Sequence, residues 1–231
     1  TDRYNMMIEA GRRAMERYLA NSLDPFHDFA ETIKIWSSDA AVRALTQGIV
    51  CIMFTDLVGS TVMTQERGDY GAQEVVRTHN AIVRTALADQ SGREVKHTGD
   101  GIMASFPTVP AAVRAAARIQ RDLARHNAQA DAVPVRVRIG LNAGEAVQEE
   151  DDFFGTTVQL AARVCDKAAA GEVFVTDNVR VLSQGQGLEF EDAGQYPLKG
   201  IPQPVTLYRV LWLLANSLGE AEVAQEPALA T

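Results

Sequence analysis

The pattern of apolar and polar positions changes at residue 49 and divides the chain into segments of different character. Within residues 1–48, Phe29, Ile33 and Trp36 recur at the spacing of one face of an amphipathic helix. This segment carries no cluster of residues suited to catalysis, so we expect helices that serve regulation or dimerisation. Residues 214–231 are expected to form a weakly ordered tail, as chain termini commonly do.

Between residues 49 and 213 strands alternate with helices. Residues 49–54 form a continuous apolar run of strand length, which is typical of a strand buried on both faces. Because the later strands include a hairpin at 93–106 and are mixed with helices, we expect an α+β fold rather than a doubly wound parallel sheet. The patterns predict helices over 60–88, 110–127 and 157–168, and further strands over 93–97, 102–106, 135–147, 173–175, 188–197 and 205–212.

The composition is that of a globular protein and narrows the range of partners. Of the 231 residues, 46% are hydrophobic and 23% are charged, so a sizeable core is available. The formal net charge of −8 argues against a nucleic-acid partner, although a local basic pocket for a nucleotide stays open. Cys51 and Cys165 lie in apolar stretches and are expected to be buried thiols in a reducing compartment.

The sequence also bears on location. Nothing in it resembles a signal peptide, and no apolar run approaches the ~18–20 residues that a membrane span needs. We therefore expect a cytoplasmic protein. Because the chain opens at Thr1 without a methionine, it is also compatible with the cytosolic part of a longer protein whose sensor or membrane domain lies upstream.

Two acidic residues lie at positions that suit a metal-bound polyphosphate. Asp56 ends the apolar strand, and the small-residue turn after it opens a helix whose backbone N–H groups can face phosphate oxygens. Asp100 lies in the hairpin turn 98–101. Each has an ordinary structural explanation, since Asp56 can cap the helix and Thr-Gly-Asp-Gly is a normal turn sequence. Side by side, the two carboxylates would hold two hard cations for an in-line phosphoryl displacement.

A third motif spans residues 152–163. Gln159 and Arg163 are four residues apart on the predicted helix and share one face, although an isolated pair of this kind is usually a solvated polar face. In their order and spacing, this motif and the segments 54–61 around Asp56 and 96–101 around Asp100 together resemble the catalytic domain of class III adenylate and guanylate cyclases, most closely that of bacterial adenylate cyclases. The resemblance covers about residues 49–212. It implies a ferredoxin-like βαββαβ core with additional strands.

The resemblance further implies a signalling enzyme that converts ATP to cyclic AMP and pyrophosphate with two Mg²⁺ (or Mn²⁺) ions. Asp56 and Asp100 resemble the two metal-binding aspartates, with the Leu57 backbone carbonyl as a further ligand. Lys96 and Asp152 resemble the pair that recognises the purine. Because guanine carries an acceptor oxygen where adenine carries a donor amine, Asp152 favours ATP over GTP.

Other positions resemble residues that act on the phosphates and the ribose. Arg163 corresponds to the arginine that stabilises the transition state, and Gln159 to the residue that positions the ribose. Arg138 and Lys199 resemble triphosphate contacts, although each could equally be an ordinary surface charge. In the family the metal ligands and the transition-state residues come from opposite protomers. The resemblance therefore implies a homodimer whose active sites lie at the interface.

One residue departs from the family's pattern. The family usually has asparagine where this chain has Gln159. The extra methylene moves the amide by about one bond length, and a misplacement of ~1 Å can cost roughly a hundredfold in rate. The departure leaves open a second hypothesis, a non-catalytic module that binds ATP and changes the geometry of its dimer. A guanylate cyclase is a third. The chain lacks the G-x-x-x-x-G-K-[ST] pattern, so phosphoryl transfer built on a P-loop has no support.

Overall fold

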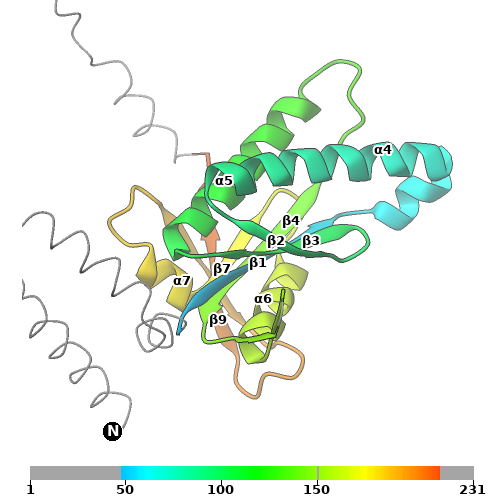
Figure 1. Ribbon diagram of the computed structural model, residues 1–231. Helices are drawn as coiled ribbons and strands as arrows, with labels where there is room; N and C mark the ends of the chain where they lie inside the picture. The colour runs from blue at the N-terminus through cyan, green and yellow to red at the C-terminus, as the bar shows by residue number, and fades with distance from the viewer. Residues whose placement is uncertain (1–47, 150, 214–231) are drawn as a thin grey trace, which may run out of the picture. The chain divides into compact units, whose positions relative to one another are not determined.

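The protein is represented by a computed structural model that describes residues 48–149 and 151–213 (Figure 1). The helices expected within residues 1–48 and the tail expected at 214–231 lie outside these residues. In the described part, seven strands form one sheet in the order β2-β3-β1-β4-β7-β9-β8, and β5 pairs with β6 in a separate hairpin. The strands are β1 Val50–Leu57, β2 Arg93–His97, β3 Gly101–Phe106, β4 Val137–Gly144, β5 Val147–Glu149, β6 Asp152–Phe154, β7 Val173–Thr176, β8 Phe190–Tyr196 and β9 Val205–Val210. The helices are α4 Ser60–Asp89, α5 Val109–Asn127, α6 Thr156–Lys167 and α7 Asp177–Leu182.

The first half of the described chain is a βαββαβ unit. The elements β1, α4, β2, β3, α5 and β4 follow one another in the chain, and their strands lie in the order β2-β3-β1-β4 with antiparallel neighbours. This is the ferredoxin-like arrangement, and it confirms the predicted α+β fold. Strand β7 joins the edge of β4 in parallel, and β9 and β8 extend the sheet further with antiparallel pairing.

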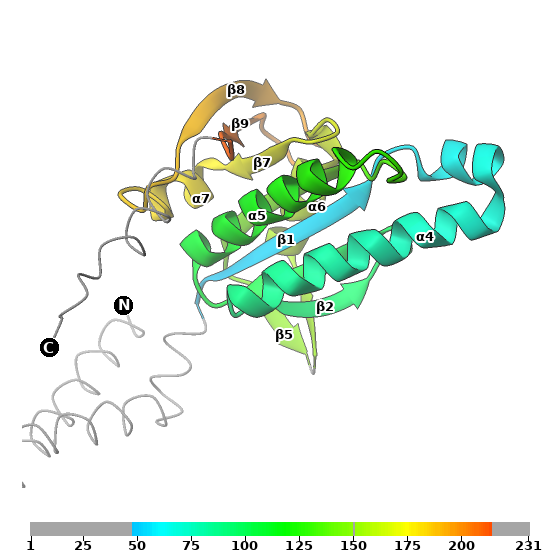
Figure 2. The same cartoon turned by 90° about the horizontal axis from the view of Figure 1, so that it is seen from above.

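Helices cover both faces of the sheet. Figure 2 shows α4 and α5 side by side over one face, and α6 packs against β1 and β4 on the other. Alternate residues of β1 supply the two cores, since Met53 packs with the apolar residues of α4 and α5 while Ile52 packs with Ala161 of α6. The alternation continues to the end of the strand. Thr55 therefore faces α4, and Asp56 faces the side of α6.

Two close approaches between elements require glycine. A Cβ atom on Gly101 would lie 1.9 Å from the Thr55 carbonyl oxygen, so glycine is what lets the hairpin turn lie against the end of β1. A Cβ atom on Gly140 would lie 2.1 Å from the backbone nitrogen of Cys165, so glycine also lets α6 lie directly on β4. These contacts bring the turn and the helix that carry predicted site residues against the centre of the sheet.

Most predicted helices and strands begin and end within about three residues of the observed bounds, but some predictions are wrong. The single strand expected over 135–147 is wrong, because β4 ends at Gly144 and the chain enters the β5–β6 hairpin. The expected continuous helix from residue 60 is broken at Gly68, where φ is 70° and ψ is 178°. Strand β6 and helix α7 have no counterpart in the prediction, because three and six residues are too few to show a period.

Candidate active site

Asp56 and Asp100 lie together where β1 ends. The backbone N–H of Leu57 donates to the Asp100 carbonyl oxygen at 3.1 Å, which joins the hairpin turn to the strand. Burial raises the pKa of the Asp56 carboxyl, Arg138 lowers it, and the charge of Asp100 and a hydrogen bond with it raise it again. The structure thus brings the two predicted metal ligands side by side, as carboxylates that repel each other unless positive charge lies between or beside them.

Arg138 supplies such a charge. It lies directly opposite Asp56 in the register of β1 and β4, and its Nε and Nη2 atoms lie 2.7 and 2.5 Å from Asp56 Oδ2. Burial alone would lower the pKa of Arg138, but the hydrogen bond and charge of Asp56 raise it. The guanidinium that the family resemblance relates to the triphosphate therefore contacts a predicted metal ligand, Asp56.

Helix α6 extends this charge network. The Arg163 guanidinium donates to Asp166 Oδ2 at 3.0 Å, and the other oxygen of the same carboxylate lies 3.9 Å from Arg138 Nη2. Opposite charges thus alternate from Asp56 through Arg138 and Asp166 to Arg163. The sequence analysis did not identify Asp166. The one indication of its contact in the sequence is that it follows Arg163 by three residues, the spacing of neighbours on a helix. Gln159 lies on the same helix with its side chain exposed.

Lys96 and Asp152 form an ion pair between β2 and β6. Lys96 Nζ lies 2.6 Å from Asp152 Oδ2, and the backbone N–H of Phe153 donates to Oδ1 at 2.8 Å. The hydrogen bond from Lys96 is the main cause that lowers the pKa of Asp152. The Lys96 ammonium also lies 5.6 Å from the centroid of the Phe154 ring. The two residues predicted to recognise a purine thus lie together, and their side chains remain 43% and 31% exposed.

Lys199 stands apart from these residues. It lies exposed in the turn between β8 and β9. Within the described residues, no hydrogen bond or ion pair joins it to another predicted site residue. Its role as a triphosphate contact stays a prediction.

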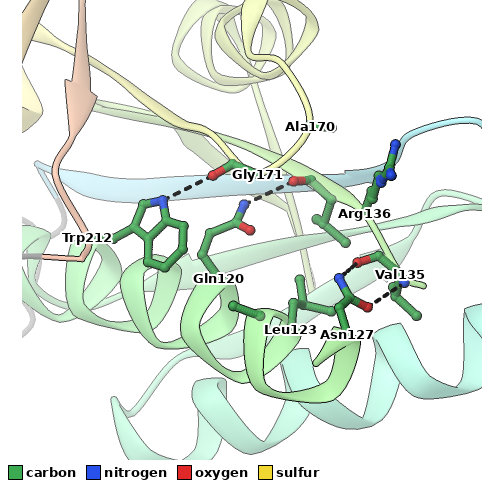
Figure 3. Close-up of a pocket in the computed structure, with 10 residues that line it drawn as sticks. Gln120, Leu123, Asn127, Val135, Arg136, Ala170, Gly171 and Trp212 are labelled. Atoms are coloured by element: carbon green, nitrogen blue, oxygen red, sulfur yellow. Dashed lines mark hydrogen bonds between the residues drawn. The ribbon is translucent and has the colours of Figure 1, made fainter. Parts of the chain in front are cut away.

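A pocket of about 270 Å³ lies between the end of α5, the start of β4 and Trp212 (Figure 3). The Gln120 amide donates to the Val137 carbonyl oxygen at 3.0 Å, and the Trp212 indole N–H donates to the Gly171 carbonyl oxygen at 3.0 Å. The polar groups of these two side chains therefore tie α5 and the segment after β9 to neighbouring backbone. None of the predicted site residues lines this pocket, which lies on the α5 face of the sheet.

In the described part of the chain, no helix is both long enough and apolar enough to cross a membrane.

Comparison with known proteins places the chain among cyclases. The family model described as the adenylate and guanylate cyclase catalytic domain matches residues 42–212. A Rhizobium meliloti relative, named as a candidate adenylate cyclase, is 27% identical over 171 residues, which are 73% of this chain and 29% of the relative. The chain thus spans less than a third of that relative's length.

Two solved structures illustrate the similarity of fold. An adenylate cyclase from Trypanosoma brucei in its monomeric state superposes with a TM-score of 0.64 at 24% identity, over 72% of this chain and 91% of that one. A Silicibacter pomeroyi protein described as an adenylate/guanylate cyclase/hydrolase superposes with a TM-score of 0.60 at 30% identity, over 70% and 95% of the two chains. These names include both nucleotide specificities.

Proposed function

The chain belongs to the family of adenylate and guanylate cyclase catalytic domains, and from this premise we propose that it converts ATP to 3′,5′-cyclic AMP and pyrophosphate as a homodimer with two divalent cations. The observation that carries the proposal is the pairing of Asp56 and Asp100 at the end of β1, where the turn and the strand are hydrogen-bonded to each other. Two adjacent carboxylates on a rigid sheet suit a site for cations and phosphates.

The oxygen ligands fit Mg²⁺ or Mn²⁺. Asp56, Asp100 and the Leu57 carbonyl would hold the ions, and Mg²⁺ is usually bound by one or two carboxylates together with water and substrate phosphates. Among the described residues, no three acidic, histidine or cysteine side chains lie so that they could hold a metal ion together, so the remaining ligands would come from the nucleotide and water. When bound, the ions would lower the pKa of the ribose 3′-hydroxyl and neutralise charge on the phosphates.

Arg138 would have two successive roles. Its guanidinium neutralises Asp56 in the structure, with Nη2 at 2.5 Å from Oδ2. Because a guanidinium and a divalent cation cannot occupy the same side of one carboxylate oxygen, Arg138 would leave Asp56 when the site fills. It would then be free to contact the triphosphate, as the family resemblance implies.

The Lys96–Asp152 pair favours adenine. Lys96 would donate a hydrogen bond to a ring nitrogen, and Asp152 would accept one from the N6 amine. Because the pKa of Asp152 is lowered by Lys96, its carboxylate is ionised at neutral pH and can only accept hydrogen bonds. The O6 atom of guanine would place an acceptor against an acceptor, which sites of this kind reject strongly.

The remaining groups would complete the reaction from the second protomer. Arg163 would stabilise negative charge that develops at the α-phosphate as pyrophosphate leaves, and Gln159 would orient the ribose. In the structure of the single chain, Arg163 hydrogen-bonds with Asp166 of its own protomer. The support for an active site shared between two protomers is the family resemblance.

A turnover assay tests the proposal. The chain is incubated with ATP or GTP in the presence of Mg²⁺ or Mn²⁺, and the products are separated by chromatography. We expect cyclic AMP from ATP, much less cyclic GMP from GTP, and no product from an Asp100→Asn variant. Faster turnover of GTP would assign a guanylate cyclase. Nucleotide binding without product would assign the non-catalytic sensor module, for which Gln159 is the supporting observation.

A further inference from the structure

Helix α4 places a histidine in the apolar core beneath the end of β1. His79 has 0% exposure and lies on the same helix face as the buried residues Val75 and Val83. A wholly buried imidazole needs a partner for each ring nitrogen. Its Nε2 atom lies 3.0 Å from Thr55 Oγ1, and its Nδ1 atom lies 2.9 Å from Asn80 Oδ1. Because burial lowers the pKa of His79, its ring is neutral at pH 7.

The chemistry of the partners fixes the direction of each hydrogen bond. Asn80 Oδ1 is an acceptor, so the single proton of the neutral His79 ring lies on Nδ1 and is donated to it. His79 Nε2 then accepts from the Thr55 hydroxyl. The Thr55 oxygen in turn accepts the backbone N–H of Ile102 at 3.0 Å. This arm of the network therefore ends on the first residues of β3.

A second arm leads from Asn80 to the other side of the hairpin turn. His97 Nδ1 accepts the backbone N–H of Gly99 at 3.2 Å. His97 Nε2 lies 3.1 Å from Asn80 Nδ2 and 3.2 Å from Asn80 Oδ1. The Asn80 amide thus hydrogen-bonds with both histidines. The two arms end on Gly99 and Ile102, which flank Asp100 and Gly101.

We propose that Thr55, His79 and Asn80 are positioning residues that fix the Asp100 turn against the strand carrying Asp56. The inference rests on the proposed function, because it gives these carboxylates their role as metal ligands. Thr55 adjoins Asp56 in β1 and points to the opposite face, so its hydroxyl ties the strand end to β3 without entering the site. Partners that orient metal ligands typically change metal affinity or activity by ~10–100-fold when removed.

A matched pair of variants at Thr55 tests the network. Thr55→Val keeps the shape and removes the hydroxyl, whereas Thr55→Ser keeps the hydroxyl. The full chain is titrated with Mn²⁺ in the presence of 3′-deoxy-ATP, which lacks the attacking hydroxyl, and free Mn²⁺ is followed by electron paramagnetic resonance. We expect Thr55→Val to weaken Mn²⁺ binding by about tenfold or more, and Thr55→Ser to stay near the wild type. Equal affinities for the folded Val and Ser variants would overturn the proposal.

Asn80→Leu provides an independent arm should Thr55→Val fail to fold. Amide hydrogen exchange, measured by NMR, should become faster at Gly99 in Asn80→Leu and at Ile102 in Thr55→Val, because each variant removes the acceptor chain for that N–H. Unchanged exchange at Gly99 in Asn80→Leu, together with unchanged Mn²⁺ affinity, would overturn the network.

The outcomes for this inference and for the proposed function differ. A wild-type chain that binds Mn²⁺ and shows the variant order, but makes no cyclic nucleotide, refutes the proposed catalysis and leaves the network in place. A chain that makes cyclic nucleotide with Thr55→Val unaffected refutes the network alone. A wild-type chain that binds no Mn²⁺ refutes the metal site and with it the positioning role.

Discussion

Arg138 and Asp56 face each other across β4 and β1, and the Arg138 guanidinium contacts one oxygen of Asp56 through both Nε and Nη2. Their side chains are 30% and 26% exposed, so the pair is only partly hydrated. Asp100 adds a second negative charge beside it. In the proposed reaction, a divalent cation would neutralise the Asp56 carboxylate in place of the Arg138 guanidinium.

The first prediction follows from this competition. Replacing the guanidinium with an apolar chain in Arg138→Met leaves Asp56 and Asp100 uncompensated, and should lower the free energy of unfolding by about 2 kcal/mol in EDTA. Saturating Mn²⁺ should restore most of that loss. Urea unfolding with and without Mn²⁺ measures both values, and the gain on adding Mn²⁺ should be larger in the variant than in the wild type.

Arg136→Met is the matched control, because Arg136 is an exposed arginine two residues earlier in the chain. It should change neither the unfolding free energy nor the Mn²⁺ gain by more than about 0.5 kcal/mol. An equal Mn²⁺ gain in Arg138→Met and the wild type would show that the cation does not bind where Arg138 neutralises charge.

The second prediction concerns nucleotide choice. Asp152→Asn keeps the side-chain shape but replaces one acceptor oxygen with an NH₂ donor. It should therefore lower kcat/KM for ATP by roughly 10–100-fold and change kcat/KM for GTP little. Asp151→Asn is the control, since its carboxyl is 95% exposed and pairs with Arg93 instead. Competition assays with both nucleotides give the ratio. If the two variants discriminate ATP from GTP equally, Asp152 does not read the base.

The third prediction is a pH dependence of stability caused by His79. Burial lowers the pKa of His79, with further lowering by His97 and Arg84, against raising effects of Asn80 and Asp100. The unfolded chain binds this proton near pH 6.5, at a higher pH than the buried His79 ring does. The unfolded state therefore gains protons first as the pH falls, and the native state loses stability below pH ~6.5 by up to ~1.4 kcal/mol per pH unit.

Urea unfolding in EDTA at pH 7.5, 6.5 and 5.5 measures this slope. His79→Gln keeps two hydrogen-bonding atoms and cannot take up a proton, so its stability should fall less steeply over that range. His126→Gln is the control, because the His126 ring contacts the Val133 carbonyl oxygen on a different part of the fold. A His126→Gln chain that flattens the curve as much as His79→Gln would assign the effect to another histidine.

The sequence predicted the main helices and strands because each is long enough for its apolar pattern to repeat. The apolar run of β1 and the helical stripes of α5 and α6 each extend over two turns or more, or over a full strand. Strands β5 and β6 have three residues each and α7 has six, so each is too short for its period to repeat clearly, and the β5–β6 hairpin and α7 were not predicted. The break in α4 depends on the backbone of Gly68, and a single glycine in a helical pattern does not reveal its φ angle.

Motif spacing and the family resemblance indicated candidate site residues, but not all of the contacts that these residues make. The sequence predicts Asp56 at the end of one strand beside Asp100 in the turn of the hairpin, and the structure places the two residues together. The contact of Asp56 with Arg138 depends on the register of two strands 82 residues apart in sequence. His79 was missed because it occupies a core position between Val75 and Val83, where a histidine looks like any satisfied core residue.

The last prediction tests the dimeric site directly. If the metal ligands and Arg163 act from opposite protomers, Asp56→Asn and Arg163→Ala homodimers are each inactive, but a mixed dimer of the two has one intact site. Random exchange of equal amounts gives half heterodimers, each with one of two sites intact, so activity should recover to roughly a quarter of the wild type. A mixture of Asp56→Asn with Asp100→Asn is the control, because both changes damage the same half of each site and their heterodimer has no intact site. No recovery by the first mixture, with heterodimers present by native mass spectrometry, would place Asp56 and Arg163 in the same half of the site. The Asp56–Arg138–Asp166–Arg163 charge network, which lies within one protomer, would then be the catalytic arrangement itself.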